Sequence, residues 1–303
     1  MYLTNNWGGC MNFDRFFSFE ISKVEEITKG FSIDKKYVIN DSFLVRVINN
    51  ERVDKFQFVF EVQQKFHKIS LCQKALKFII EDGIGYYITE YLQGENGLDV
   101  IGNFSEREQY DFGVLAAKEL VRFHKAYPMH DFNAKTYTDE YFNSKVEIAR
   151  RNNIEKMIPK IEELIKVVRN NLHILYDLKG VLTHSDYHLF NMIFDGDQYM
   201  GVIDFERCRA GYCLTDFRNN SPHNSRVSPH FASGYIDGYL NEFHYPNFFE
   251  MYNVHDMMMS IAALPWVMEF NPENLDNDIA YINDLFDDVN DITKRPRWYV
   301  GKY

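Results

Sequence analysis

Four side chains in the middle of the chain, His184, Asp186, Asn191 and Asp204, have the types and spacing that phosphoryl transfer requires. The first three stand at the His-x-Asp-x4-Asn offsets of a phosphoryl-transfer catalytic loop. Such catalysis depends mainly on positioning and charge neutralisation, because the transition state is loose. Asn191 and Asp204 offer the oxygen ligands that Mg²⁺ takes, and Asp186 could orient an acceptor hydroxyl and take its proton. A nearby cation would keep Asp186 ionised.

The elements expected around these residues would bring them together. An apolar strand at 181–182 precedes the loop and a second strand at 192–194 follows it. The turn Asp195-Gly196-Asp197 then reverses the chain into a strand at 199–203. Antiparallel pairing would place Asn191 and Asp204 at the same end of this hairpin. Asp186 lies on the loop that enters that end, so we expect the three oxygen-bearing side chains to converge.

Other interpretations of these residues stay open. Asp186 and Asp204 could be turn or cap residues. His184, Asp186 and His188 alternate as transition-metal ligands do, which would indicate a metallohydrolase, although the other histidines form no recognisable ligand motif. His184 alone could be a buried histidine that braces the loop by hydrogen bonds.

The sequence on the N-terminal side predicts a small antiparallel β lobe over residues 1–93. A hairpin over 37–48 turns at Asn40-Asp41-Ser42, a helix is expected over 53–69, and further strands lie at 78–80 and 86–92.

After Gly94 the pattern becomes helical. Ser105 and Glu108 form a capping box that opens a helix, and a further helix is expected to start near Asn153. The predicted fold class is therefore α+β, with a nucleotide-binding lobe at 1–93 and a larger, mainly helical lobe at 94–303 for catalysis and the acceptor. A ligand would be expected at the interface of two such lobes.

Composition predicts a cytoplasmic globular protein. Hydrophobic residues make up 46% of the 303 residues, which is ordinary for a folded chain with a substantial core. The four cysteines show neither a C-x-x-C pair nor zinc-ligand spacing, so we expect them to be reduced. We expect no signal peptide and no membrane-spanning segment.

The net negative charge of the chain argues against some classes of binding partner. The chain carries 33 basic and 44 acidic side chains, a formal net charge of −11. This field repels nucleic acids and anionic membranes, so we expect neither as a partner. It suits a cationic small molecule, and it equally suits solubility alone.

The phosphate groups of a nucleotide need a cation and hydrogen-bond donors. Arg46 ends an apolar strand segment and could face them, or it could be a solvated charge at a strand edge. Gly30-Phe31-Ser32 precedes the first hairpin, where backbone amides and the Ser32 hydroxyl could reach phosphates. No Walker A sequence and no G-x-G-x-x-G occurs, which argues against a P-loop or Rossmann site.

With these motifs the sequence resembles the aminoglycoside phosphotransferase and choline kinase-like family. The resemblance is carried by HSDYHLFN at 184–191 and VIDFE at 202–206, and it extends over most of the chain. It implies a protein-kinase-like fold, ATP or GTP as phosphoryl donor, Mg²⁺ as cofactor and a small-molecule hydroxyl as acceptor.

The resemblance also implies roles for single residues of the loop region. Asp186 would be the catalytic base, and Asn191 and Asp204 the metal ligands. His184 and Asp216 would support the loop.

On the nucleotide side, Arg46 stands where the family has a phosphate-contacting Lys or Arg. Glu61 is the candidate for its acidic partner. The backbone of Glu90 to Leu92 would bind the purine, and Ser32 would lie near the phosphates.

Two positions depart from the family pattern. Ser185 occupies a site that is usually Gly, and Tyr212-Cys213 stand where Asp-Pro is common before Asp216. Both departures affect the shape of the loop more than its chemistry.

The acceptor is left open by the sequence. An aminoglycoside-type antibiotic, choline, homoserine or an amino sugar would each fit the family, and a non-catalytic nucleotide-binding protein is the other class considered. A cationic antibiotic could bind an acidic cluster that equally suits a solvated helix face, at Glu273, Asp276, Asp278, Asp284, Asp287, Asp288 and Asp291.

Overall fold

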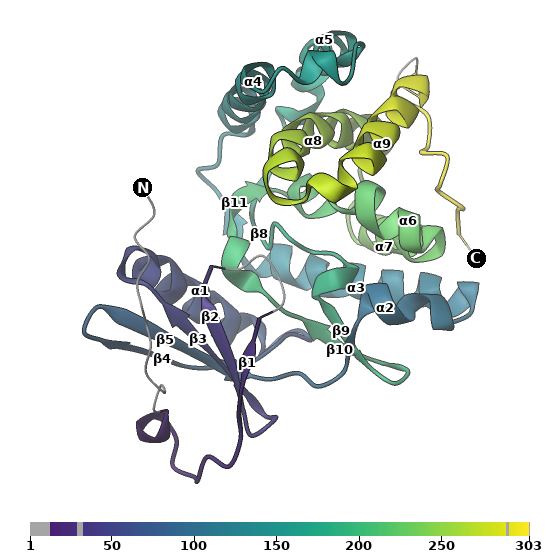
Figure 1. The fold of residues 1–303 in the computed structure, drawn as a ribbon. Helices are drawn as coiled ribbons and strands as arrows, with labels where there is room; N and C mark the ends of the chain where they lie inside the picture. Colours follow the sequence, from purple (N-terminus) through teal and green to yellow (C-terminus); the bar gives the residue numbers. More distant parts are fainter. Residues whose placement is uncertain (1–12, 29–32, 289–290, 303) are drawn as a thin grey trace. The chain divides into compact units, whose positions relative to one another are not determined.

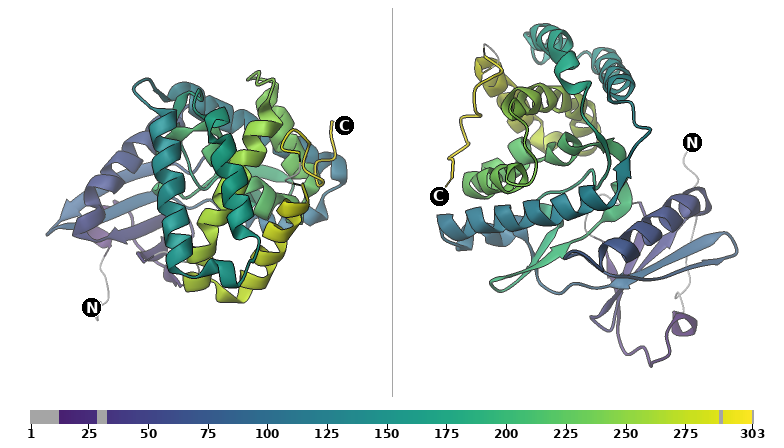
Figure 2. Two further views of the ribbon diagram at one scale, coloured as in Figure 1. Left: turned by 90° about the horizontal axis from the view of Figure 1, so that it is seen from above. Right: turned by 180° about the vertical axis from the view of Figure 1, so that it is seen from behind.

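The structure, a computed structural model, describes residues 13–28, 33–288 and 291–302 (Figures 1 and 2). The chain divides into two compact units. The first comprises Met1–Gln64 and Gln73–Gln93, and the second comprises Lys65–Cys72 and Gly94–Tyr303. Ser32 lies outside the described residues.

The first unit is built on a five-stranded antiparallel sheet in the order β1-β2-β3-β5-β4. Its turn at Asn40 and Asp41 has φ angles of 49° and 53°, which Asn and Asp tolerate better than other side chains that carry a Cβ. The strands are β1 (Val24–Ile27), β2 (Lys35–Ile39), β3 (Phe43–Ile48), β4 (Ala75–Glu81) and β5 (Ile84–Glu90). The antiparallel N-terminal β lobe predicted from the sequence is confirmed.

The two faces of this sheet have different covers, because alternate residues of a strand point to opposite sides. Val45 and Ile88 belong to a buried apolar cluster with Phe13 and Phe16 on one face. On the other face α1 (Val53–Phe66) brings Phe56 to 5.5 Å from the ring of Tyr87, centroid to centroid. The predicted helix was drawn too long, since it ends at Phe66 rather than Ile69.

The second unit is mainly helical, as predicted. In Figures 1 and 2, α8 lies among α4, α5 and α9, and it contacts all three. The helices are α2 (Gly97–Val100), α3 (Glu106–Ala126), α4 (Ala134–Arg151), α5 (Ile161–Asn171), α6 (Ser225–Val227), α7 (Pro229–Leu240), α8 (Phe248–Phe270) and α9 (Leu275–Asp288).

Two small antiparallel sheets complete this unit. One has the order β10-β9-β6 and the other β11-β8-β7. The strands are β6 (Glu95–Asn96), β7 (Pro128–Met129), β8 (Gly180–Thr183), β9 (Met192–Asp195), β10 (Gln198–Val202) and β11 (Arg209–Tyr212).

Helices α3 and α7 pack backbone against backbone. A Cβ on Gly113 would lie 2.1 Å from the carbonyl oxygen of Phe231, and one on Gly234 would lie 2.1 Å from that of Tyr110. The predicted capping box of α3 is present, since Ser105 Oγ accepts from the Glu108 amide and the Glu108 carboxylate accepts from the Ser105 amide. Helix α3 also contacts the loop that carries Asp186, because the Tyr187 hydroxyl donates to the Ala116 carbonyl at 2.9 Å.

The predicted helix near Asn153 starts elsewhere. Asn153 has a left-handed φ of 54° and follows the end of α4, and α5 begins only at Ile161, after Pro159. No helix in the described part of the chain has the length and apolar character needed to cross a bilayer.

Candidate functional site

The hairpin formed by β9 and β10 brings Asn191 and Asp204 to one end. Met192 pairs with Val202, and the Ile203 amide donates to the Asn191 carbonyl at 2.9 Å. The chain reverses at Gly196, whose φ of 58° suits a glycine in a tight turn. Asp204 itself has a φ of 63°, so the chain bends sharply after the strand.

Asp186 lies beside the first of these residues, held by contacts to both of its carboxylate oxygens. Asn191 Nδ2 donates to the Asp186 carbonyl at 2.9 Å and to Oδ2 at 3.2 Å. Asn219 Nδ2 donates to Oδ1 at 3.1 Å. His188 Nε2 lies 3.3 Å from Oδ1, and Arg207 Nε lies 3.8 Å from Oδ2.

These neighbours set the protonation state of Asp186. Burial alone would raise its pKa, but the hydrogen bond and charge of His188 and the charge of Arg207 together hold the pKa below its ordinary value. The carboxylate is therefore ionised at neutral pH and ready to accept a hydrogen bond from a hydroxyl.

His184 ties the loop to the foot of the hairpin. Its Nε2 donates to the Ile203 carbonyl at 3.1 Å, and the Asp186 amide donates to Nδ1 at 3.3 Å. Burial is the main influence on its pKa, which is lowered, so the ring stays neutral with the proton on Nε2. Both ring nitrogens are committed to the protein.

Asp216 anchors the start of the loop that carries Asp186. Its carboxyl group is fully buried and accepts from the His184 amide at 3.1 Å and from the Ser185 amide at 2.5 Å. His124 Nε2 contacts the same group at 2.9 Å. The geometry makes Asp216 an anchor for two backbone amides at the entry to the loop.

Ser185 adopts a backbone conformation that favours glycine. Its φ is 65°, in the left-handed region, and its hydroxyl lies 2.7 Å from Thr183 Oγ1. The departure from the glycine common at this position is therefore accommodated by a local hydrogen bond.

The family model described as the phosphotransferase enzyme family matches residues 23–249, which includes the loop and both feet of the hairpin. The chain belongs to this family. The predicted family membership is confirmed, and no curated protein matches the sequence.

Solved structures show the same fold at low sequence identity. The ADP-bound aminoglycoside phosphotransferase APH(2'')-Ib has a TM-score of 0.61 at 17% identity, over 88% of this chain and 93% of that one. The gentamicin complex of APH(2")-IIa gives 0.60 at 17% identity, over 87% and 91%. A thermostable APH(4)-Ia mutant gives 0.63 at 11%, over 88% and 95%. The protein-kinase-like fold predicted for this phosphotransferase is confirmed.

In the first unit of this phosphotransferase, Arg46 is buried under α1 and paired with an acid. Arg46 Nη2 lies 3.0 Å from Asp34 Oδ2, and its guanidinium carbon lies 5.0 Å from the Phe56 ring centroid. Arg52 pairs with the other oxygen of Asp34. The alternative of a solvated charge at the strand edge is wrong, because Arg46 is only 5% exposed.

Glu61 was the wrong choice for the acidic partner of Arg46. Its side chain is exposed on α1 and accepts from Gln57 Nε2 at 3.1 Å, one turn away on the same helix. Asp34 takes the place instead, because β2 pairs with β3 in a register that puts Lys36 opposite Arg46. The acid comes from the residue just before the neighbouring strand rather than from the helix.

In the segment from Glu90 to Leu92, which is expected to bind the purine, the Glu90 carbonyl already accepts one hydrogen bond. The Glu90 amide donates to the Lys74 carbonyl at 2.9 Å, and the Glu90 carbonyl accepts from Gln73 Nε2 at 2.8 Å. A carbonyl oxygen has two lone pairs, so one remains for a further donor. Within the described residues, nothing accepts a hydrogen bond from the Leu92 amide.

Sequence reasoning missed two residues that touch Asp186. Asn219 comes from 33 positions along the chain, and no local pattern marks it. Arg207 could have been found, because it follows Asp204 by three residues in the bend after the hairpin.

The metallohydrolase interpretation lacks a ligand set. Both nitrogens of His184 are engaged, and no group of three His, Cys, Asp or Glu side chains in the described part of the chain could hold a metal ion.

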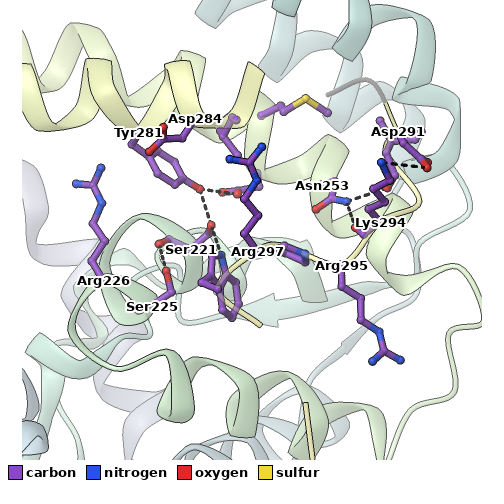
Figure 3. Close-up of a pocket in the computed structure, with 16 residues that line it drawn as sticks. Ser221, Ser225, Arg226, Asn253, Tyr281, Asp284, Asp291, Lys294, Arg295 and Arg297 are labelled. Carbon is purple, nitrogen blue, oxygen red and sulfur yellow. Dashed lines mark hydrogen bonds and ion pairs between the residues drawn. The ribbon is translucent and has the colours of Figure 1, made fainter. Parts of the chain in front are cut away.

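A cavity of about 340 Å³ lies in the second unit, among α6, α8, α9 and the C-terminal segment (Figure 3). The Tyr281 hydroxyl contacts Ser221 Oγ at 2.5 Å and Asp256 Oδ2 at 2.6 Å. Burial raises the pKa of Asp256 to about 6. The wall of this cavity is close to the loop, since His223, two residues after Ser221, packs 5.8 Å from His188, centroid to centroid.

Proposed function

We propose that this phosphotransferase is a small-molecule kinase, which moves the γ-phosphoryl group of ATP or GTP to a hydroxyl of a small acceptor. The observation that carries the proposal is the position of Asp186. It is ionised, it is oriented by Asn191 and Asn219, and it lies at the foot of the hairpin that ends at Asp204. Residues 1–93 would bind the nucleotide, and residues 94–303 would carry catalysis and the acceptor.

Asp186 acts in this proposal by orienting the acceptor. A carboxylate fixed on both oxygens accepts the hydroxyl hydrogen in one direction, which fixes the attacking oxygen in line with the phosphoryl group. Its low basicity is compatible with this role, because little proton transfer has occurred in a loose transition state. The proton passes to the carboxylate as the new phosphate ester forms and the bond between the γ-phosphoryl group and the departing nucleoside diphosphate breaks.

The hairpin feet suit a magnesium ion. Asn191 uses Nδ2 to donate to Asp186, so its Oδ1 faces away as an acceptor, the atom that a hard cation takes. Asp204 would supply a carboxylate oxygen from the neighbouring foot. Mg²⁺ bound to these oxygens would neutralise charge on the nucleotide phosphates.

The nucleotide would be held by residues of the first unit. We propose that the Arg46 guanidinium, kept in place by Asp34 and Phe56, donates to the phosphates. The Glu90 carbonyl and Leu92 amide would pair with the purine edge. Ser32 remains a candidate for the phosphates. Because nucleoside triphosphates are supplied there, we propose that the reaction takes place in the cytoplasm.

The test separates catalysis from nucleotide binding. Phosphoryl transfer from ATP or GTP is measured with an acceptor panel of aminoglycosides, macrolides, choline, homoserine and amino sugars, at varied Mg²⁺. Asp204→Asn should raise the Mg²⁺ concentration needed for turnover by about tenfold or more, since it removes a charged ligand. Asp195→Asn, at the far end of the same hairpin and exposed, should change nothing.

A non-catalytic nucleotide-binding protein would give a different result. It would be stabilised against heat by ATP and Mg²⁺ and would transfer phosphate to no member of the panel. An unchanged Mg²⁺ dependence in Asp204→Asn would contradict the proposed metal site. A resistance panel on a susceptible bacterium that expresses the chain tests whether an antibiotic is the acceptor.

A further inference from the structure

Three cations, Lys145, Arg209 and Arg218, lie on segments that adjoin the loop of Asp186 or pack against its neighbours; we call them the cation cluster. Arg209 opens β11 and pairs with Thr183, three residues before Asp186. Arg218 immediately precedes Asn219, which donates to Asp186 Oδ1 at 3.1 Å. Lys145 comes from α4, which packs against β11.

The members of the cation cluster are near enough to act on one another. The pKa of Lys145 is lowered first by burial and then by the positive charges of Arg218 and Arg209. Arg218 also acts on His255, whose pKa falls to about 3, chiefly because the ring is buried. That histidine is therefore neutral and adds no charge of either sign.

Among the side chains that the structure describes, no member of the cation cluster forms an ion pair with a carboxylate. Other cations of α4 do have acidic partners: Lys135 lies 2.8 Å from Asp139, and Arg151 pairs with Glu147. Arg209 is exposed and Lys145 and Arg218 are half-buried, so the cation cluster can be reached by a ligand.

An aromatic surface adjoins the cation cluster. Lys145 Nζ lies 5.4 Å from the Tyr141 ring centroid, and Tyr141 stacks on Tyr137 with 6.1 Å between centroids and 14° between planes. Tyr137 in turn packs edge-on against the buried Tyr212. A flat ring face of this kind packs well against a sugar ring or an apolar chain.

Resting on the proposed kinase function, we infer that the acceptor carries an oxyanion, a phosphate or a carboxylate, which the cation cluster binds while a hydroxyl of the same molecule meets Asp186. Guanidinium and ammonium groups form charge-assisted hydrogen bonds with such groups. A polycationic acceptor would instead be repelled here, since like charges held close together raise the energy of both.

The experiment uses acceptor pairs that differ only in charge. Hexose 6-phosphates are compared with free hexoses and amino hexoses, and hydroxy acids with their amides. Each compound is titrated calorimetrically into the full chain saturated with Mg²⁺ and a non-hydrolysable ATP analogue, and is then assayed for phosphoryl transfer. The two oxyanion arms distinguish a phosphate-bearing acceptor from a carboxylate-bearing one.

The variants assign the effect to the cation cluster. Lys145→Gln and Arg218→Gln should raise the KM or Kd of an anionic acceptor by about tenfold or more, with kcat and nucleotide affinity changed less than about twofold. Arg151→Gln is the matched control, because Arg151 is exposed and lies six residues after Lys145 in α4. This variant should change neither the KM nor the Kd of the acceptor.

Three results would overturn the inference: binding by no anionic member of either pair, preference for the neutral or cationic members, or variants that weaken nucleotide binding instead of acceptor binding. The last result would assign the cation cluster to the nucleotide phosphates. Failure of the proposed kinase function is distinct, because the wild-type chain would then show no Mg²⁺-dependent nucleotide binding or turnover at all.

Discussion

Replacing Asp216 by Asn tests how the catalytic loop is held. The side chains are almost the same size, so the change alters hydrogen bonding and charge rather than packing. Asp216 accepts from the Ser185 amide through Oδ1 and from the His184 amide and His124 through Oδ2. An asparagine can keep only one of these oxygens, and its NH₂ group would face a backbone N–H.

The magnitude follows from these contacts. In its better orientation the asparagine keeps the two bonds at Oδ2 and leaves the Ser185 amide buried without an acceptor. That costs about 1–3 kcal/mol, and losing the negative charge weakens the other two bonds, so we expect a destabilisation of about 3 kcal/mol. The melting temperature should fall by about 6–12 °C. Because Ser185 precedes Asp186, kcat should also fall while nucleotide affinity is kept.

Asp237→Asn is the matched control for this change. Asp237 is also buried in the second unit, but it accepts from the hydroxyls of Tyr110 and Tyr299 at 2.8 and 2.6 Å. A hydroxyl can turn and accept from the new NH₂ group, whereas a backbone amide cannot. Calorimetric melting and steady-state kinetics should therefore show a smaller loss for Asp237→Asn, with kcat kept. Equal losses in the two variants, or an Asp216→Asn protein as stable as wild type, would refute this reasoning.

Three further changes test other parts of the structure. Asp256→Asn should gain stability relative to wild type as the pH rises. Burial raises the pKa of Asp256 from 3.8 to about 6, so the stability that its protonated form contributes is present below about pH 4 and is lost as the pH rises through 6. The difference in the free energy of unfolding in urea should grow to about 3 kcal/mol by pH 7, and a difference independent of pH would contradict this. Gly113→Ala should destabilise the protein by about 3 kcal/mol or more, because its Cβ would meet the Phe231 carbonyl oxygen at 2.1 Å. Gly102→Ala is the control and should be nearly neutral in thermal melting, since no described atom lies within 4 Å of its Cβ. Equal effects of the two variants would count against the close packing of α3 and α7. The free energy of unfolding of Ser185→Gly should lie within about 1 kcal/mol of the wild-type value, since relief of the left-handed backbone offsets the lost hydrogen bond of the hydroxyl. A large loss of stability would show that the hydroxyl matters more than the backbone.

The convergence of Asn191 and Asp204 could be predicted from the sequence because a hairpin is a local structure. A glycine turn and alternating strands fix the pairing register, and the register fixes which residues meet at the far end. Ile203 donating to Asn191 follows directly from that register. His184 as a brace was also within reach, since a histidine between a buried strand and a loop has few other roles.

The partners that come from distant segments could not be predicted. Asn219 and Asp34 are placed by tertiary packing, and nothing in their own neighbourhood marks them as partners of Asp186 and Arg46. The choice of Glu61 followed the family pattern of an acid on the helix, but here the carboxylate belongs to Asp34, the residue just before β2. Helix α4, in contrast, is marked by local features of the sequence. Asn133 caps the helix, and Phe142 and Val146, four residues apart, share its buried face.

The central claim is that Asp186 orients an acceptor hydroxyl toward a bound nucleotide. Single-turnover transfer of labelled γ-phosphate, in wild type and in Asp186→Asn, tests it most directly, with nucleotide affinity measured in the same samples. The account predicts that transfer slows about 100-fold or more in the variant while the nucleotide still binds with unchanged affinity. Transfer at the wild-type rate in Asp186→Asn would contradict it.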